Sequence, residues 1–346
     1  MKSVRNLSLL LIVILVGCGS NPPAPAVPDS SSTTPGNQSA EPAKETGDAA
    51  SPEKKLTLGV MPKLVGIDFF NATERGAREA AKELGVELVY DGPVTNDVQQ
   101  QVQMIETWIA KGYNAIAVAP NDPDAIAPVL EDAKAKGAAV VAWDADAAHG
   151  ARDYFVSQCT PESVAKALLD LVAQNAGEDA KYIILTGSLT AANQNIWMQE
   201  MEKYRQARYP QMTNLSETPK VSEEDQALAT QVTTDILKAY PEVEAILAIT
   251  TVALPGAAEA LKNSDRRDQV FLTGVSTPNV MREYVEQGVV KGFVLWDAVD
   301  LGYLTVQVAA AAAKGTLDPS QESFTAGRLG ALKVADRVVV LGEPIV

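Results

Sequence analysis

Cysteine and histidine are nearly absent from this chain of 346 residues, which contains two cysteines and a single histidine. So few cysteines cannot form a disulfide framework. His149 lies in a loop-like stretch, where we expect a solvated side chain. The sequence also lacks a zinc-type His/Cys cluster, a phosphate-binding loop and a Gly-x-Ser-x-Gly elbow. These absences argue against an enzyme, and we expect no catalytic residue, no metal site and no cofactor.

Positive charge is also scarce. The chain has 29 lysines and arginines against 44 acidic residues, which gives a formal net charge of −15 at pH 7. This balance disfavours nucleic acid and anionic lipid as partners, and it favours solubility. It does not indicate a cationic ligand, because a solvated acidic surface is the usual cause of such an excess.

Long hydrophobic runs are missing as well. The apolar run at residues 9–16 is too short for a transmembrane helix of about 20 residues, and no later segment reaches that length. The run follows Lys2 and Arg5 and ends in small residues, an order typical of a secretory signal. Residues 15–18, with the sequence LVGC, resemble the bacterial lipobox. The resemblance implies cleavage before Cys18 and attachment of diacylglycerol to its thiol.

Cleavage before Cys18 would change three properties of the chain. Loss of Lys2 and Arg5 would take the formal charge from −15 to −17. The lipid on Cys18 would be the only membrane attachment that the sequence predicts. Cys159 would have no intramolecular partner, and we expect it to be a buried, inert thiol.

The segment after the signal has the composition of a linker. Residues 19–53 are rich in proline, serine, threonine, alanine and glycine and contain few large apolar side chains, so they cannot build a core. A flexible chain of that length spans on the order of 30–35 Å. We therefore divide the N-terminal region into a signal peptide (1–17) and a lipidated cysteine with a disordered linker (18–54).

From residue 55 onward, short apolar segments alternate with longer amphipathic ones. Residues 98, 102, 105 and 109 are apolar, and this spacing of four, three and four is a helical period. The sequence predicts strands at 56–61, 86–90, 115–119, 138–143, 154–158, 182–186, 244–249, 270–275 and 292–296, and helices at 68–84, 98–109, 123–136, 193–209, 223–239, 253–262 and 279–287. Such alternation is typical of a doubly wound α/β fold, in which helices cover both faces of a parallel sheet.

The folded part is too long for one sheet, and two similar lobes fit it better. We expect residues 154–158, 296–299 and 325–340 to cross between the lobes and to form a three-segment hinge. The N-terminal lobe would then contain residues 55–157 and 298–325. The C-terminal lobe would contain residues 158–297 and 326–346.

Polar and aromatic side chains follow the predicted strands in both lobes. In open parallel sheets, ligands bind beyond the carboxyl ends of the strands. The candidate ligand-binding residues at these ends are Lys63, Phe69, Phe70, Asn121, Asp144, Asn193, Gln194, Thr250, Trp296 and Asp297. Carboxylates and amides can form paired hydrogen bonds with adjacent hydroxyls, and aromatic rings can cover the apolar face of a sugar. This mixture of side chains favours a neutral polyol, with Lys63, Asp144 and Asp297 forming charge-assisted bonds.

Several of these segments resemble the type I periplasmic sugar-binding proteins of ABC transporters, in the branch that binds rhamnose and autoinducer-2. The segments that carry the resemblance are PKLVG…FF (62–70), YDGP (90–93), GYNAIAV (112–118), PDA (123–125), WDAD (143–146), NQNIW (193–197), STPNVM (276–281) and LWD (295–297). The resemblance implies two α/β lobes, a three-segment hinge and one small sugar-like ligand in the cleft.

The resemblance also bears on which ligand is bound. Lys63, Asp144 and Gln194 match the autoinducer-2 pattern, but Asn193 and Ile249 replace its aspartate and proline. Thr251 stands at the position of its alanine. The segments that instead resemble the rhamnose type are the threonine before NQNIW, TTV (250–252), DLGY (300–303) and TAGR (325–328). A rhamnose-like deoxyhexose is therefore favoured, with autoinducer-2 as the alternative.

The resemblance implies a receptor that is anchored by lipid in the cell envelope and faces the periplasm or the exterior. We expect a monomer that closes on a sugar and then docks on an ABC permease. One alternative is a subunit that presents the sugar to a membrane receptor without transport. A transcription regulator would need a basic helix-turn-helix, and residues 1–54 contain a signal and a linker instead.

Overall fold

The computed structural model describes residues 55–346. The signal peptide, the lipidation site at Cys18 and the linker predicted from the sequence lie outside the described residues. Across residues 55–346, none of the helices combines the length and the apolar character that crossing a bilayer requires.

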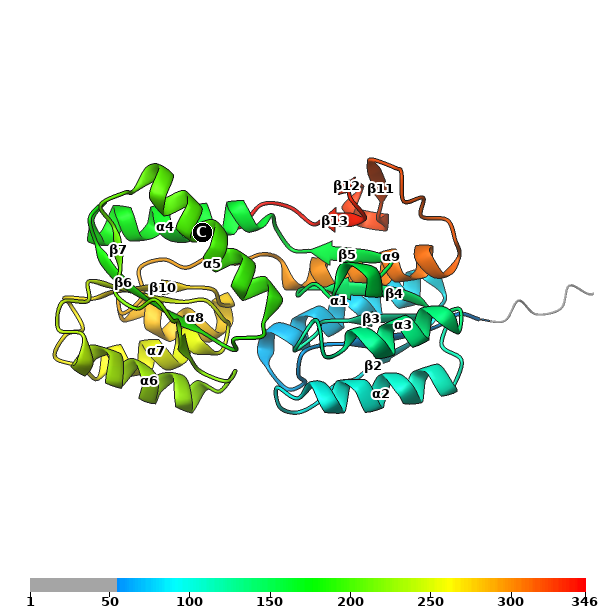
Figure 1. The fold of residues 1–346 in the computed structure, drawn as a ribbon, viewed down its shortest axis with the longest axis horizontal. Helices are drawn as coiled ribbons and strands as arrows, with labels where there is room; N and C mark the ends of the chain where they lie inside the picture. The colour runs from blue at the N-terminus through cyan, green and yellow to red at the C-terminus, as the bar shows by residue number, and fades with distance from the viewer. Residues whose placement is uncertain (1–54) are drawn as a thin grey trace, which may run out of the picture. The chain divides into compact units, whose positions relative to one another are not determined.

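The first sheet has eight strands in the order β11-β12-β13-β5-β4-β3-β1-β2. In chain order its strands are β1 (Thr57–Met61), β2 (Glu87–Tyr90), β3 (Ala115–Val118), β4 (Ala139–Trp143), β5 (Tyr154–Ser157), β11 (Ser323–Thr325), β12 (Ala331–Ala335) and β13 (Val338–Val340). The pairings among β1 to β5 and between β13 and β5 are parallel, whereas β12 pairs antiparallel with both β11 and β13. We call this sheet and the helices packed on it the first lobe (Figure 1).

The second sheet has five strands, all paired in parallel. They are β6 (Lys181–Thr186), β7 (Thr213–Asn214), β8 (Lys220–Val221), β9 (Ala245–Ala248) and β10 (Phe271–Gly274). This sheet and its helices form the second lobe (Figure 1). The two parallel sheets confirm the predicted α/β fold.

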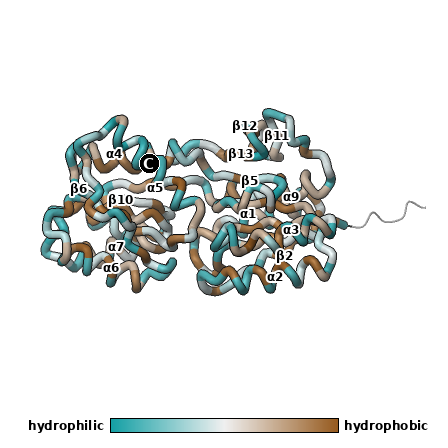
Figure 2. Tube along the Cα trace, in the orientation of Figure 1, coloured by the Kyte–Doolittle hydropathy of each residue, from teal (hydrophilic) through white to brown (hydrophobic). Residues whose placement is uncertain are grey.

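Helices cover both faces of each sheet, because successive strand residues point to opposite faces. In the first lobe, α1 (Asp68–Leu84) and α9 (Ala298–Ala313) share a core with Leu58 and Val60, whereas α2 (Val98–Ala110) and α3 (Ala127–Ala135) pack on Ile116 and Val118. The helices of the second lobe are α4 (Pro161–Ala176), α5 (Ala192–Arg208), α6 (Gln226–Ala239), α7 (Ala253–Lys262) and α8 (Pro278–Glu286). Figure 2 shows hydrophobic residues alternating with hydrophilic ones along outer helices such as α2 and α6.

Two glycines allow α1 and α9 to approach each other closely. A Cβ atom on Gly76 would lie 1.8 Å from the carbonyl oxygen of Val299, and one on Gly302 would lie 1.9 Å from that of Thr73. Any larger residue at either position would therefore push the two helices apart. This contact holds α1 against α9, and the first turn of α1 carries two of the aromatic residues of the site described below.

The chain returns from the first lobe to the second later than the sequence suggests. The expected boundary at 325/326 is wrong, because residues 331–340 form β12 and β13 in the first sheet. These strands form a hairpin whose turn residues, Asp336 and Arg337, have φ of 51° and 64°. The third crossing follows Val340 and runs beside the other two, since Leu341 donates a backbone hydrogen bond to Ser157 and Ile345 pairs with Leu295.

Three predicted elements also differ from those in the structure, two at their first residue and one in type. The helix expected from residue 123 begins at Ala127, because the side chain of Asp122 binds two backbone N–H groups in a preceding turn. The helix expected from residue 223 begins at Gln226 with Asp225 as its N-cap. Residues 292–296 form only isolated bridges, not a strand.

Candidate ligand-binding site

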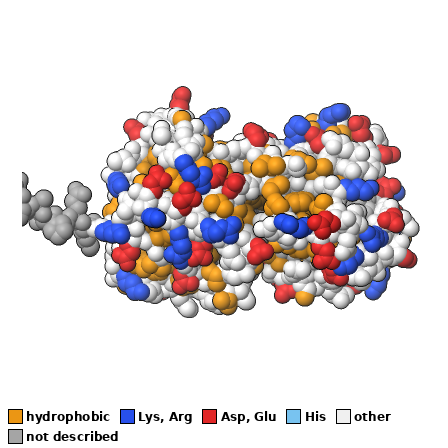
Figure 3. Space-filling view, turned by 180° about the vertical axis from the view of Figure 1, so that it is seen from behind, with side chains coloured by type: hydrophobic (Ala, Val, Ile, Leu, Met, Phe, Trp, Pro, Cys, Tyr) orange, Lys and Arg blue, Asp and Glu red, His pale blue; other side chains and the backbone are white. Residues whose placement is uncertain are grey.

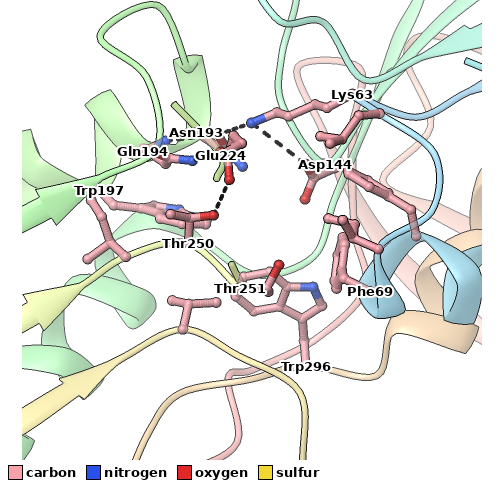
Figure 4. A pocket seen from close by; sticks show the side chains of 15 residues that line it. Lys63, Phe69, Asp144, Asn193, Gln194, Trp197, Glu224, Thr250, Thr251 and Trp296 are labelled. Carbon is pink, nitrogen blue, oxygen red and sulfur yellow. Dashed lines mark hydrogen bonds and ion pairs between the residues drawn. The ribbon is translucent and has the colours of Figure 1, made fainter. Parts of the chain in front are cut away.

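A cavity lies between the carboxyl ends of the strands of the two lobes (Figure 4). The space between its lining atoms amounts to about 380 Å³, and part of this space is open to solvent. Its lining residues are Lys63, Leu64, Ile67, Phe69, Phe70, Asp144, Asn193, Gln194, Trp197, Glu224, Ile249, Thr250, Thr251, Val275 and Trp296. This is the place where open parallel sheets bind their ligands.

Lys63 extends across the cavity from the first lobe to the second. It follows β1 and is only 4% exposed. Its Nζ donates a hydrogen bond to Oδ1 of Asn193 over 2.9 Å and lies 4.0 Å from Oδ2 of Asp144. Asn121 holds the backbone here, because its Nδ2 donates to the carbonyl oxygen of Lys63 over 2.9 Å. Lys63 thus lies between polar groups of both lobes.

Asp144 directly follows β4, and its carboxylate lies at the cavity. Its backbone has φ of 62°, a left-handed conformation that is uncommon for residues other than glycine and is often found at functional sites. The side chain is buried, yet within residues 55–346 no group donates a hydrogen bond to its carboxylate. Burial raises its pKa to about 6, although the nearby charge of Lys63 opposes this and that of Glu224 adds to it. A buried acceptor of this kind needs a donor from a bound molecule or from water.

The polar groups of the second lobe bind one another. The side-chain oxygen of Gln194, in the first turn of α5, accepts hydrogen bonds from Thr186 over 2.5 Å and from the backbone N–H of Gly187 over 2.7 Å. Its Nε2 donates to Oε1 of Glu224 over 2.8 Å. Thr250 donates a short hydrogen bond to the other oxygen of Glu224. This network fixes Gln194 and Glu224 on one side of the cavity.

Aromatic rings form another wall of the cavity. Trp296 lies edge to face against Phe69 and Trp197, with ring centroids 6.1 and 5.7 Å apart. Phe69 also contacts Phe70, the next residue of α1, at 5.0 Å. The indole nitrogen of Trp296 is buried and has no hydrogen-bond partner in the part of the chain that the structure describes. The wall can therefore pack against apolar groups of a ligand.

Eight of the ten residues proposed from the sequence line this cavity, and two do not. Asn121 lies behind it and binds the backbone of Lys63. Asp297 is exposed and caps α9, since its carboxylate accepts a hydrogen bond from the backbone of Asp300 over 2.9 Å. The sequence placed Asp297 in the site because it directly follows the strand predicted at 292–296, but that segment is not a strand. For the eight residues in the cavity, ligand contact stays a prediction.

Seven further lining residues were not proposed from the sequence. Five of them are Leu64, Ile67, Trp197, Ile249 and Thr251, which stand next to proposed residues or in the same strand-end segments, so proximity alone could have indicated them. Val275 follows β10 in the same way. Glu224 could not be found in this manner, because the sequence placed it inside a helix.

The cavity offers hydrogen-bonding groups rather than reactive ones. Among residues 55–346 no group of three or more His, Cys, Asp or Glu side chains could hold a metal ion. Cys159 is buried away from the cavity, and burial raises the pKa of its thiol to about 12. His149 is exposed in the short 3-10 turn η1 (His149–Ala151). Two parallel-sheet lobes around a polar cavity with aromatic walls define a receptor for a small molecule.

Residues 58–317 match a family model described as a periplasmic binding protein domain. Because this match covers most of the chain, the protein belongs to the periplasmic binding protein family. The family and the fold predicted from the sequence are therefore confirmed.

Solved structures agree with this assignment. A sugar ABC transporter protein from Actinomyces odontolyticus is 34% identical, with a TM-score of 0.67 over 84% of this chain and 94% of that one. A solute-binding protein from Clostridium phytofermentas with bound L-rhamnose is 27% identical, with a TM-score of 0.80 over 84% and 95%. LsrB from Clostridium saccharobutylicum, in complex with AI-2, is also 27% identical, with a TM-score of 0.79 over 84% and 96%.

Proposed function

We propose that this protein is the lipid-anchored solute receptor of an ABC sugar importer and that it binds one small neutral sugar in the cavity between its lobes. One observation carries the proposal. The carboxylate of Asp144 is buried at the cavity and accepts no hydrogen bond from residues 55–346. A sugar hydroxyl would supply the missing donor and would form a charge-assisted bond.

The other lining groups support a sugar over an apolar or a strongly charged ligand. Asp144 and Glu224 offer acceptors, and the ammonium group of Lys63 offers donors. Neutral sugars carry hydroxyls that can donate to the former and accept from the latter. The edge-to-face rings of Phe69 and Trp296 would cover the apolar surface of the sugar ring.

A rhamnose-like deoxyhexose is the ligand we favour. The similar protein with bound L-rhamnose supports this choice, as do the TTV and TAGR segments noted in the sequence. Autoinducer-2 is the alternative, supported by the similar LsrB and by Lys63, Asp144 and Gln194. The apolar side chains of Ile67 and Ile249 would give the methyl group of a deoxyhexose a surface to pack against.

The proposal extends to how the protein is held and what it contacts. We propose that lipid on Cys18 and the linker after it confine a monomeric receptor near a membrane, which raises its effective concentration at a permease there. Figure 3 shows acidic and basic side chains interspersed over one face, without the basic stripe that nucleic-acid binding requires. Cys18→Ser should release the protein from membranes and leave sugar affinity unchanged. A Cys18→Ser protein that stays in the membrane fraction would contradict the lipid anchor.

The sugar proposal is tested by thermal unfolding in the presence of L-rhamnose, autoinducer-2 and D-ribose. A ligand at 100 times its dissociation constant should add about 2.7 kcal/mol to the free energy of unfolding. Asp144→Ala should abolish this stabilisation. Asp297→Asn, which changes a carboxylate outside the cavity and keeps a good helix cap, should retain it. If neither these three compounds nor any other deoxyhexose or pentose shifts the unfolding temperature, the sugar proposal is wrong.

A further inference from the structure

Glu224 occupies the cavity because of an unusual loop. It lies between β8 and α6, and its φ of 54° follows one of 51° at Glu223. Two successive left-handed residues other than glycine are strained and persist only where the surroundings hold them. Here β8 pairs with the end of β6, and Ser222 donates backbone and side-chain hydrogen bonds to the carbonyl oxygen of Thr186. The loop therefore directs Glu224 toward the residues that follow β6.

Neighbouring groups leave space for the Glu224 carboxylate and orient it. A Cβ atom at residue 187 would lie 2.1 Å from its Oε1, so Gly187 provides the space that the carboxylate fills. Gln194 and Thr250 each donate one hydrogen bond to it, and Gln194 is itself held at Gly187 and Thr186. Two side chains hold this carboxylate at the edge of the cavity, in the space that Gly187 leaves.

The contacts of Glu224 differ from those of a structural carboxylate. No lysine or arginine within residues 55–346 forms a salt bridge with it. Two of its roughly four acceptor positions are occupied by Gln194 and Thr250, which leaves acceptor capacity for another donor. Figure 4 shows Asp144 and Glu224 on opposite sides of the open centre of the cavity.

We propose that Glu224 is a ligand-binding and specificity-determining residue, whose carboxylate accepts a hydroxyl hydrogen from the edge of the sugar opposite Asp144. This inference rests on the proposed function. It narrows the substrate class to neutral sugars with hydroxyl donors on two opposite edges, one for the carboxylate of each lobe. A ligand held in this way would bridge the lobes through two charge-assisted hydrogen bonds.

The first experiment measures L-rhamnose, autoinducer-2 and D-ribose binding by calorimetry in wild type, Glu224→Gln and Glu223→Gln. Glu223 is the matched control, because it has the same side chain, loop and backbone conformation but is exposed and lines no part of the cavity. Glu224→Gln should weaken binding at least tenfold, which corresponds to about 1.4 kcal/mol, and Glu223→Gln by less than twofold. Equal unfolding temperatures without ligand would show that both variants fold.

A second measurement distinguishes a direct contact between Glu224 and the sugar from an indirect effect of Glu224 on binding through Gln194. The 2-, 3- and 4-deoxy analogues of the bound sugar are titrated into wild type and Glu224→Gln. If Glu224 binds a hydroxyl, at least one deletion should cost tenfold in wild type and less than threefold in the variant.

Equal losses in both proteins, or Glu224→Gln affinity within threefold of wild type, would overturn this inference and leave the proposed function standing. Failure of wild type to bind any sugar would overturn both.

Discussion

The polar side chains that the first lobe contributes to the cavity have few protein partners, whereas those of the second lobe are held by their neighbours. Lys63 has one side-chain hydrogen bond, and Asp144 has none within the described chain. In the second lobe, Gln194, Glu224 and Thr250 form one connected network. In the first lobe, Asp144 therefore lacks a hydrogen-bond donor that a ligand could supply. In the second lobe, the polar side chains are already ordered by one another.

This difference suggests how the cavity gains both affinity and selectivity. A buried carboxylate without a donor costs free energy in the unliganded protein, so a hydroxyl that binds Asp144 relieves that cost. A network that is already formed loses little conformational freedom on binding and so fixes which hydroxyls fit. On this account Asp144 supplies most of the affinity, and the second lobe discriminates among sugars.

The largest effect should come from Asp144→Asn, which keeps the shape of the side chain and removes its charge. We expect sugar affinity to fall about 100-fold, because a hydrogen bond to a charged group is lost. The unliganded variant should be more stable than wild type at pH 7.5 by up to about 3 kcal/mol, because burial raises the pKa of Asp144 to about 6. Calorimetry and urea unfolding measure the two quantities.

The difference in stability between Asp144→Asn and wild type depends on pH. The raised pKa means that the folded state binds more protons than the unfolded state between about pH 4 and 6, so ionisation of Asp144 destabilises wild type as pH rises through this window. The advantage of Asp144→Asn should therefore vanish at pH 4. A variant that is less stable than wild type at pH 7.5 would show that Asp144 has a structural partner.

The pH dependence of binding should be the next largest effect. If the ligand binds ionised Asp144, affinity should fall about tenfold between pH 7.5 and pH 5, because the carboxylate takes up a proton with a pKa of about 6. Asp144→Asn should show a flat profile over the same range. The same slope in both proteins would assign the pH dependence to another group.

A smaller effect should follow from Gly187→Ala in the second lobe. The added methyl group would displace the carboxylate of Glu224, and we expect affinity to fall three- to tenfold. Gly150→Ala is the control, since a Cβ atom there has no neighbour within 4 Å. Equal affinities for the two variants would indicate that the exact position of Glu224 is unimportant.

The smallest effect should come from a hydrogen bond between the lobes. Thr190 Oγ1, in the second lobe, donates to the carbonyl oxygen of Asn121 in the first lobe over 2.9 Å. Thr190→Val removes this hydrogen bond between the lobes and should weaken sugar binding two- to fivefold. Thr107→Val removes a comparable bond inside α2 and should leave affinity unchanged. No difference between them would mean that this contact does not contribute to closure.

The sequence predicts the first-lobe part of the cavity well, because Lys63 and Asp144 lie within two residues of the ends of strands with a clear apolar pattern. Strand order and the parallel arrangement then bring these ends together. The sequence did not predict that Glu224 lines the cavity, and the reason is physical. Its two-residue strand, β8, has no periodicity, and its left-handed backbone is imposed by contacts with β6 rather than by local sequence preference.

The end of the chain shows a second limit. The apolar residues of β13 are compatible with a crossing segment or with a strand, and only pairing with β5 decides between them. The role of Asp297 was also undetermined by sequence, because a carboxylate after an apolar segment can face a ligand or cap the following helix. In each case a long-range contact decides the outcome.

The role of Asp144 in sugar binding is tested most directly by titrating this residue itself. The titration is monitored through the 13C resonance of its carboxyl group, with and without the sugar that stabilises the protein most. We expect a midpoint near pH 6 in the free protein and a clearly lower midpoint with the sugar bound, because hydroxyl donors favour the ionised form. A midpoint near pH 4 without ligand, or one that the sugar does not move, would contradict this role.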